Sequence, residues 1–312
     1  MKKLKKIVLI ALILVLLTGC TKTLKDGKEI VKNDATGQTL TANIICKPKD
    51  QDLYNKYQEY DEKLAVSLED LPSCKSFSPG KLKYKGLWES IFIKPLAYII
   101  LKIGYLIKNM GLSVMIIGLL IRLIMLPLQV KTVLQTENMK KAGPELAKIE
   151  KKYKNKTDNE SLMAKSQETM MIYKKYKINP VGGCLMAFIQ LPLFFAFLEA
   201  INRVPAIFEG SFLTMNLGMT PITGISHHNY LYIILILLIM VTTFLSFRNT
   251  MKSQGDNNMM GDQMKMMSIV MIVMVSVASL SLPTAIALYW IVTNGFAVIQ
   301  NFIIKKIVEK RK

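Results

Sequence analysis

The chain has 312 residues, of which 51% are hydrophobic and only 20% are charged. A soluble domain has about a quarter charged residues and does not collect its apolar residues into long runs, so the composition excludes an ordinary soluble protein and indicates a membrane protein. The formal net charge of +19 is typical of Lys concentrated on cytoplasmic loops, and it does not indicate DNA or RNA binding because no nucleic-acid-binding motif accompanies it.

Residues 1–20 have the form of a lipoprotein signal sequence. Four Lys residues precede an apolar run, 7–17, that is too short to cross a bilayer. The run ends at Leu17-Thr18-Gly19-Cys20, which resembles the lipobox of bacterial lipoproteins. The resemblance implies cleavage after residue 19 and a diacylglyceryl thioether on Cys20, which would hold the new N-terminus on the outer leaflet. An ordinary signal sequence with a chance Cys is the alternative.

The segment 20–82 is predicted to be an exported, lipid-anchored region. It is polar and Lys-rich, and part of it, around 50–70, is expected to be helical. Cys46 and Cys74 lie in it, and a disulfide between them is possible in an oxidising compartment, but their spacing leaves the pairing open. The sequence has neither a CxxC pair nor a Cys/His cluster, so we expect no metal and no cofactor.

The segment 83–110 is predicted to be an amphipathic helix that lies in the membrane interface. Polar residues recur at steps of three to four on one face, and the opposite face is apolar, with Trp88 at headgroup level. The polar face comprises Lys94, Tyr98, Lys102, Tyr105 and Asn109.

Five later apolar stretches are long enough to span a bilayer. They lie at about 111–130, 181–201, 229–247, 264–281 and 284–304. The predicted fold class is an all-α polytopic membrane protein, with five transmembrane helices in a core at 111–305, an interfacial amphipathic helix, a cytoplasmic helical hairpin and a basic cytoplasmic tail at 306–312.

The charge of the loops supports this count. With the N-terminus outside, five spans place 131–180, 248–263 and 305–312 in the cytoplasm. Residues 131–178 hold 12 Lys against 6 acidic residues, whereas the outside loop 202–228 holds one basic residue. This distribution follows the positive-inside rule, which would be violated throughout if 87–108 also spanned the membrane.

The cytoplasmic segment 133–178 is predicted to be a pair of antiparallel amphipathic helices. Leu146, Ile149 and Tyr153 share one face, Met163, Met170 and Tyr173 share another, 155–159 forms the turn, and Pro144 lies near the start of the first helix or breaks it. Its positive charge is compatible with binding ribosomal RNA, anionic lipid or an acidic partner, and equally with a solvated hairpin.

Arg122 is the twelfth residue of the first span. At a rise of ~1.5 Å per residue it lies ~18 Å into the span. An Arg that faces lipid at this depth costs ~2.5–3.5 kcal/mol. Since Glu199 falls near the outer end of its span, we expect no carboxylate at the same depth, which indicates a water-filled cavity around Arg122. The alternative is an Arg that snorkels to the cytoplasmic interface.

Other polar residues are expected at comparable depth in the second and fifth spans. They are Gln190, Trp290, Thr293, Asn294, Gln300 and Asn301. Each alone is typical of an interhelical hydrogen bond. Together with Arg122 they are predicted to line one hydrophilic groove.

Three motifs, in this order and spacing, resemble the YidC/Oxa/Alb membrane protein insertases, and the lipobox resembles the Gram-positive type. They are IRLIMLPL at 121–128, the run 179–194 around Gln190, and LYWIVTN at 288–294 followed by Gln300-Asn301. The resemblance covers about 83–308. It implies a groove open to cytoplasm and lipid, in which Arg122 receives hydrophilic parts of substrates.

The resemblance also implies a non-enzymatic function in the cell membrane. No nucleotide-binding motif is present in the sequence. The implied partners are nascent membrane proteins, the Sec translocon, the ribosome (through the hairpin and the basic tail) and membrane lipids. Two other functions stay open: a secondary transporter or channel that binds an anionic solute through Arg122, and a lipid-anchored binding protein that acts through 21–86.

Overall fold

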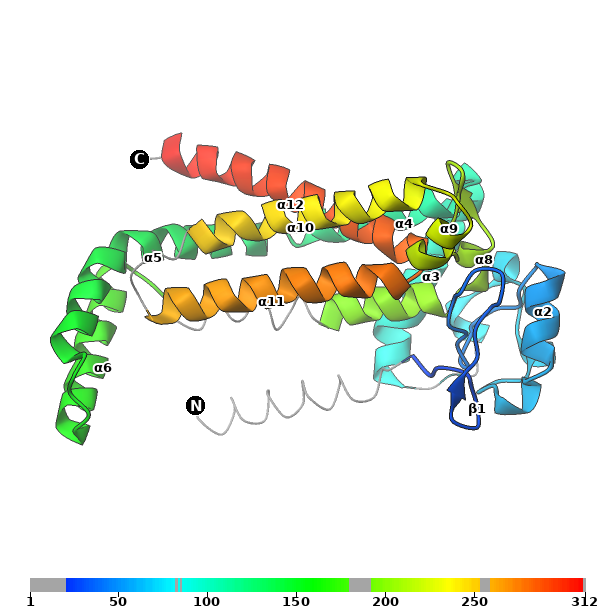
Figure 1. Cartoon of the computed structure of the whole chain (residues 1–312), viewed down its shortest axis with the longest axis horizontal. Helices are drawn as coiled ribbons and strands as arrows, with labels where there is room; N and C mark the ends of the chain where they lie inside the picture. Colours follow the sequence, from blue (N-terminus) through cyan, green and yellow to red (C-terminus); the bar gives the residue numbers. More distant parts are fainter. Residues whose placement is uncertain (1–20, 82–83, 85, 180–191, 253–258, 311–312) are drawn as a thin grey trace. The chain divides into compact units, whose positions relative to one another are not determined.

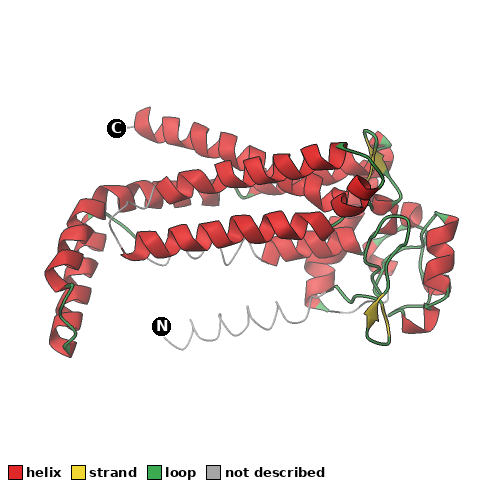
Figure 2. Ribbon diagram, in the orientation of Figure 1, coloured by secondary structure: helices red, strands yellow, loops and turns green. Residues whose placement is uncertain are grey.

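The computed structural model describes residues 21–81, 84, 86–179, 192–252 and 259–310, and they are mostly helical (Figures 1 and 2). The longer helices are α3 (Lys94–Ile107), α4 (Met110–Ile124), α5 (Leu126–Tyr153), α6 (Asn159–Lys175), α10 (Leu231–Lys252), α11 (Met259–Ser281) and α12 (Thr284–Lys310). The described residues fall into two compact units. The first takes them from 1–118, 191–237 and 278–290, and the second from 119–190, 238–277 and 291–312.

Three helices in the described residues are long and apolar enough to cross a membrane: Glu89–Ile107, Leu231–Arg248 and Thr284–Ile304. A fourth is obtained if α4 and α5, which meet at a break at Met125, count as one bent span. Two shorter apolar helices, Pro192–Asn202 and Ile272–Ser281, fall within the predicted second and fourth spans. Most of the second span, 180–191, lies outside the described residues, so the count of five remains a prediction.

Residues 21–81, which the sequence predicts to be exported and which we call the exported region, bury a set of apolar side chains. The hairpin of β1 (Lys25–Asp26) and β2 (Glu29–Ile30) turns at Gly27, whose φ of +56° suits a residue without a Cβ. The helix α2 (Gln51–Gln58) begins where the Asp50 carboxylate accepts from the Leu53 N–H. Short turns η1 to η4 follow at Asp61–Lys63, Leu68–Asp70, Cys74–Ser76 and Pro79–Lys81.

Cys46 and Cys74 form a disulfide, which answers the question that their spacing left open. The bridge closes a loop across a sequence separation of 28 residues. Both cysteines are buried, and Ile45 next to Cys46 is fully buried. The disulfide therefore links α2 and the following turns to the core of the exported region.

The amphipathic segment forms one helix, and its buried side includes one residue of the predicted polar face. It begins with a π-helical turn, η5 (Glu89–Ile93), and continues as α3. Ile93, Ala97 and Ile100 are fully buried. Lys94, which was expected on the polar face, is also buried, because its ammonium donates to the Tyr84 carbonyl over 2.7 Å. The interfacial position of this helix remains a prediction.

The loop between the second and third predicted spans packs against the exported region. It contains α8 (Pro205–Phe208), the hairpin of β3 (Ser211–Phe212) and β4 (Met215–Asn216), and α9 (Pro221–Ser226). The Thr220 N–H donates to the Thr36 carbonyl, and the Ile45 N–H to the Arg203 carbonyl, each over 2.9 Å. Because these contacts are direct, the exported region and this loop must lie on the same side of a membrane.

In the second unit, α6 packs against the C-terminal part of α5 (Figure 1). Ala142 and Leu146 of α5 bury against Tyr173 and the following Ile178. Salt bridges Lys152–Glu168 and Lys175–Glu145 join the two helices, and their order along the chain shows that the helices are antiparallel.

One expectation for this helix pair was wrong, and one predicted face is buried only in part. Pro144 lies inside α5, which begins at Leu126 and is continuous through the proline. The first helix of the pair therefore starts before residue 133, where the predicted hairpin begins. Met163 and Met170 are 65% and 51% exposed, because only Tyr173 of the predicted face reaches the buried contact with α5.

Candidate functional site

The predicted groove residues are distributed over both units. Arg122 lies in the last turn of α4 with a half-buried side chain. Arg122 belongs to the second unit. The same unit holds four of the predicted groove residues on α12: Thr293, Asn294, Gln300 and Asn301. Trp290, also on α12, belongs to the first unit. Gln190 lies outside the described residues.

The polar residues of α12 are turned into the second unit rather than to its surface. Thr293 and Gln300 are 3% and 4% exposed. Asn294 donates from Nδ2 to the Thr243 hydroxyl on α10 over 3.0 Å. This contact is an interhelical hydrogen bond between α10 and α12, which is the simpler of the two roles that the sequence left open for Asn294.

Gln300 differs from Asn294. In the part of the chain that the structure describes, neither the Nε2 nor the Oε1 atom of Gln300 has a hydrogen-bond partner, although both are buried. The Nε2 atom of Gln129 on α5 is also buried and has no hydrogen-bond partner among the described residues. A buried amide without a partner costs about 1–3 kcal/mol, and such groups in native proteins are normally satisfied by water or a ligand.

Trp290 belongs to an aromatic cluster in the first unit. Its indole stacks on Phe194 with 6.1 Å between ring centroids, and the neighbouring Tyr289 stacks on Phe197 with 4.1 Å. Trp290 is 8% exposed. These contacts pack the start of α12 against the helix Pro192–Asn202.

A second cluster, which the sequence analysis did not predict, surrounds Arg203 in the first unit. The Arg203 side chain is fully buried and forms ion pairs with Glu89 and Glu199. Its Nε donates to the Asn43 carbonyl over 2.7 Å. We call Arg203, Glu89, Glu199, Trp88 and Tyr84 the Arg203 cluster.

Trp88 and Tyr84 complete this cluster. The Trp88 indole donates from Nε1 to Oε2 of Glu199 over 2.9 Å, and Trp88 is buried. Its position at headgroup level stays a prediction. The Tyr84 ring lies 4.7 Å from the guanidinium carbon of Arg203. Burial raises the pKa of Tyr84 to about 12, so its hydroxyl stays protonated and donates to the Ile44 carbonyl.

The only sequence signal for the Arg203 cluster was the spacing of Glu199 and Arg203, four residues apart at the end of an apolar run, where side chains share a helix face. The contribution of Glu89, more than a hundred residues away, had no local signal. In the described residues, no group of three or more His, Cys, Asp or Glu could hold a metal ion.

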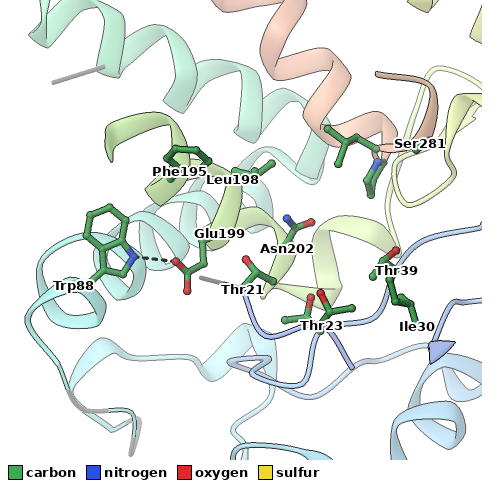
Figure 3. A pocket seen from close by; sticks show the side chains of 13 residues that line it. Thr21, Thr23, Ile30, Thr39, Trp88, Phe195, Leu198, Glu199, Asn202 and Ser281 are labelled. Atoms are coloured by element: carbon green, nitrogen blue, oxygen red, sulfur yellow. Dashed lines mark hydrogen bonds between the residues drawn. The ribbon is translucent and has the colours of Figure 1, made fainter. Parts of the chain in front are cut away.

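A cavity of about 610 Å³ lies beside this cluster, within the first unit (Figure 3). One wall comes from the start of the exported region, including Thr21, Thr23 and Ile30. Further lining comes from the helix Pro192–Asn202 and from 281–283, where α11 ends and α12 follows. Glu199 lines the cavity, with its carboxylate held by Trp88 (Figure 3).

Comparison with known proteins identifies the family. Residues 102–311 match the sequence family described as 60Kd inner membrane protein. The chain is 35% identical to the membrane protein insertase YidC of Oceanobacillus iheyensis over 71% of this chain and 84% of that protein. It is 34% identical to the membrane protein insertase YidC 2 of Bacillus anthracis over 72% of this chain and 83% of that protein. Identity to the membrane protein insertase MisCA of Bacillus subtilis is 36%, over 59% of this chain and 66% of that protein. The chain therefore belongs to the YidC/Oxa/Alb family of membrane protein insertases.

Proposed function

We propose that this chain is a membrane protein insertase, which receives the hydrophilic parts of nascent membrane proteins and releases their apolar segments into the bilayer. The observation that carries the proposal is the similarity to proteins named membrane protein insertases, which extends over 84% of the length of the O. iheyensis protein. Polar side chains buried among apolar helices of the second unit support the same function.

The receiving site that we propose is a hydrophilic groove of the second unit, which contains Arg122 and Gln300 and is lined by Thr293, Asn294 and Asn301. The parts assigned to Gln190 and Trp290 in this groove stay predictions from the sequence. The Gln300 amide supports this assignment because, among the described residues, it has no protein partner and so needs water or a polar group of a substrate. A positive charge at Arg122, in surroundings of low dielectric constant, attracts an acidic tail or loop. A wet groove also shortens the apolar distance that this tail must cross.

Release needs no nucleotide. The apolar segment of the substrate partitions into lipid, and each central Leu or Ile contributes roughly half a kcal/mol. Arg122 and the buried amides bind polar groups without changing them chemically, so the proposed function is not enzymatic.

The proposed topology has Cys20 lipidated outside, the helix 83–110 in the interface, five spans within 111–305, and α5–α6 with the tail 306–312 in the cytoplasm. The basic helix pair and tail are then placed to meet the ribosome and the emerging chain. Cooperation with the Sec translocon is part of the same proposal.

Depletion and complementation in a cell that lacks a paralogue test this function. We expect that depletion of the protein stops insertion of single- and double-spanning proteins with short acidic tails, and that the plasmid-borne chain restores it. Protease protection of the substrate tail measures insertion. Normal insertion after depletion would refute the proposal.

A further inference from the structure

The cavity beside the Arg203 cluster has the properties of a binding site for a lipid chain. Its volume of about 610 Å³ lies within the range of roughly 300–1,000 Å³ that is usual for small-molecule pockets. Ile30 and Phe195, which line it, are 49% and 45% exposed. Leu198 adds further apolar surface (Figure 3), as do Leu282 and Pro283.

We infer that this cavity holds an acyl chain of the chain's own lipid anchor, attached to Cys20. The inference rests on the proposed lipidation of Cys20. The anchor would then do more than tether the N-terminus to the bilayer, because it would fasten the exported region to the helix Pro192–Asn202 and to the turn at 281–283.

The position of the attachment point supports this occupant. Thr21, the residue that follows Cys20, is itself part of the cavity wall. Consecutive Cα atoms are about 3.8 Å apart, so a thioether on Cys20 begins within one residue of the wall.

The polar groups at the cavity suit an uncharged glyceryl ester. Thr21, Thr23, Thr39 and Thr41 supply hydroxyl groups on the side of the exported region, which can donate to ester carbonyls. Glu199 is the only acidic residue among the described residues that line the cavity, and its carboxylate is engaged by Trp88 and Arg203. An acyl chain would therefore not meet an unpaired charge there.

The same wall disfavours a phospholipid of the bilayer. A phosphate headgroup is normally bound by Arg, Lys or clustered N–H donors. None of the residues described as lining this cavity is Lys or Arg. The diacylglyceryl group of a lipoprotein has no phosphate, so it can enter the cavity without burying a second negative charge beside Glu199.

Photo-crosslinking in cells tests the inference with the full chain. Cells are grown with a fatty acid that carries a diazirine and a terminal alkyne, irradiated, and the purified protein is digested for mass spectrometry. We expect a crosslinked species that joins the Cys20 lipopeptide to the peptide containing Phe195 and Leu198, or to the peptide containing Leu282.

A matched pair of variants sharpens the test. Leu198→Trp places a larger side chain in the cavity and should reduce this crosslink several-fold. Ile222→Trp, at a residue that is 58% exposed and does not line the cavity, should leave it unchanged. Formation of the Cys46–Cys74 disulfide reports whether each variant is folded, and Leu282→Trp replaces Leu198→Trp if that variant fails this check.

Two results would overturn the inference. If the Cys20 lipopeptide crosslinks only to phospholipid, or if the adducts at 192–202 have the mass of phospholipid, the anchor does not occupy the cavity. If Cys20 carries no lipid, the inference falls with the lipidation. In either case the insertion assay still reports on the proposed function separately.

Discussion

Arg203 donates from Nη1 to Oε1 of Glu199, one helical turn earlier, over 3.1 Å, and the same nitrogen also pairs with Glu89. One fully buried guanidinium is thus shared by two carboxylates from distant parts of the chain. Because its Nε also bonds to the Asn43 carbonyl, Arg203 joins the exported region to the start of η5 and to the helix Pro192–Asn202.

Replacement of Arg203 should destabilise the first unit. Arg203→Ala leaves Glu89 and Glu199 facing each other without a counter-charge, and the loss of one partner from a buried ion pair costs about 3–5 kcal/mol. We expect a clear fall in the midpoint of thermal unfolding of the detergent-purified protein. Arg248→Ala, at an exposed residue of α10, is the control and should change the midpoint little. Addition of Glu89→Gln and Glu199→Gln to Arg203→Ala should recover part of the loss, and no recovery would contradict the charge argument.

Loss of the disulfide should loosen the exported region. A bridge across 28 residues stabilises by about 3–4 kcal/mol in the loop-entropy model. Cys46→Ser with Cys74→Ser should therefore make 21–81 more susceptible to limited proteolysis from the outside. The bridge itself can be counted with a maleimide reagent after denaturation. With Cys20 lipidated, Cys184 alone should react in the oxidised protein, and three cysteines after reduction; three reactive thiols without reduction would show that the bridge is missing in the cell.

Arg122 should act through its charge. Arg122→Ala is expected to impair insertion of substrates with acidic tails, whereas Arg122→Lys keeps the positive charge and should retain most of the activity, since no bidentate geometry is required. Substrates with neutral tails should respond less to Arg122→Ala. The measurement is protease protection of tail variants in depleted cells. Equal loss in Ala and Lys variants would refute the role assigned to the charge.

Gln300 should contact water if the groove exists. In a Cys184→Ser background, Gln300→Cys should react with a membrane-impermeant maleimide supplied from the cytoplasmic side, although the side chain is 4% exposed in the protein alone. Ile299→Cys is the matched control, because Ile299 is the neighbouring residue on α12 and is 58% exposed. We expect Ile299 to face lipid, where a polar maleimide does not react. The reverse order of reactivity would contradict the proposed groove.

The contact between α5 and α6 should weaken in acid. Hydrogen bonds from Lys175 and Tyr176 lower the pKa of Glu145, and those from Lys152 and Tyr153 lower the pKa of Glu168. Because the pKa of each carboxyl is lower in the folded protein than in the unfolded chain, the ionised carboxylates stabilise the contact between α5 and α6 at pH values above the unfolded pKa. This stabilisation is lost as the pH falls through the lowered folded-state pKa values. Hydrogen exchange should therefore show less protection of the α6 amides at a pH below the lowered pKa values of Glu145 and Glu168 than at neutral pH.

The control for this effect is the double variant Glu145→Gln with Glu168→Gln. It should begin with lower protection in α6 at neutral pH and should change less on acidification. A variant that keeps the full acid dependence would assign the effect to other groups.

Several elements could be predicted because their signals are local. The apolar stretches at 229–247, 264–281 and 284–304 appear as α10, α11 and α12, since the length of an apolar run is a property of consecutive residues. The helix around 50–70 is present as α2. Lys94 was misplaced because periodicity identifies a polar residue and not the carbonyl of Tyr84 that allows it to be buried.

The candidate site was predictable only as a set of residue types. Asn294 is engaged by Thr243 while Gln300 has no partner among the described residues, although both are amides at similar positions on α12. Their difference depends on which side chains the neighbouring helices bring to each position, as Thr243 of α10 is brought to Asn294, and periodicity along α12 does not contain this information.

From the sequence alone, the chain could be recognised as a helical membrane protein of the insertase family, because run length, charge distribution and short motifs are properties of neighbouring residues. The pairing of Cys46 with Cys74, the burial of Arg203 and the cavity next to Thr21 were decided by the tertiary structure. Each of them joins side chains far apart along the chain, and such contacts form only when packing brings the distant segments together.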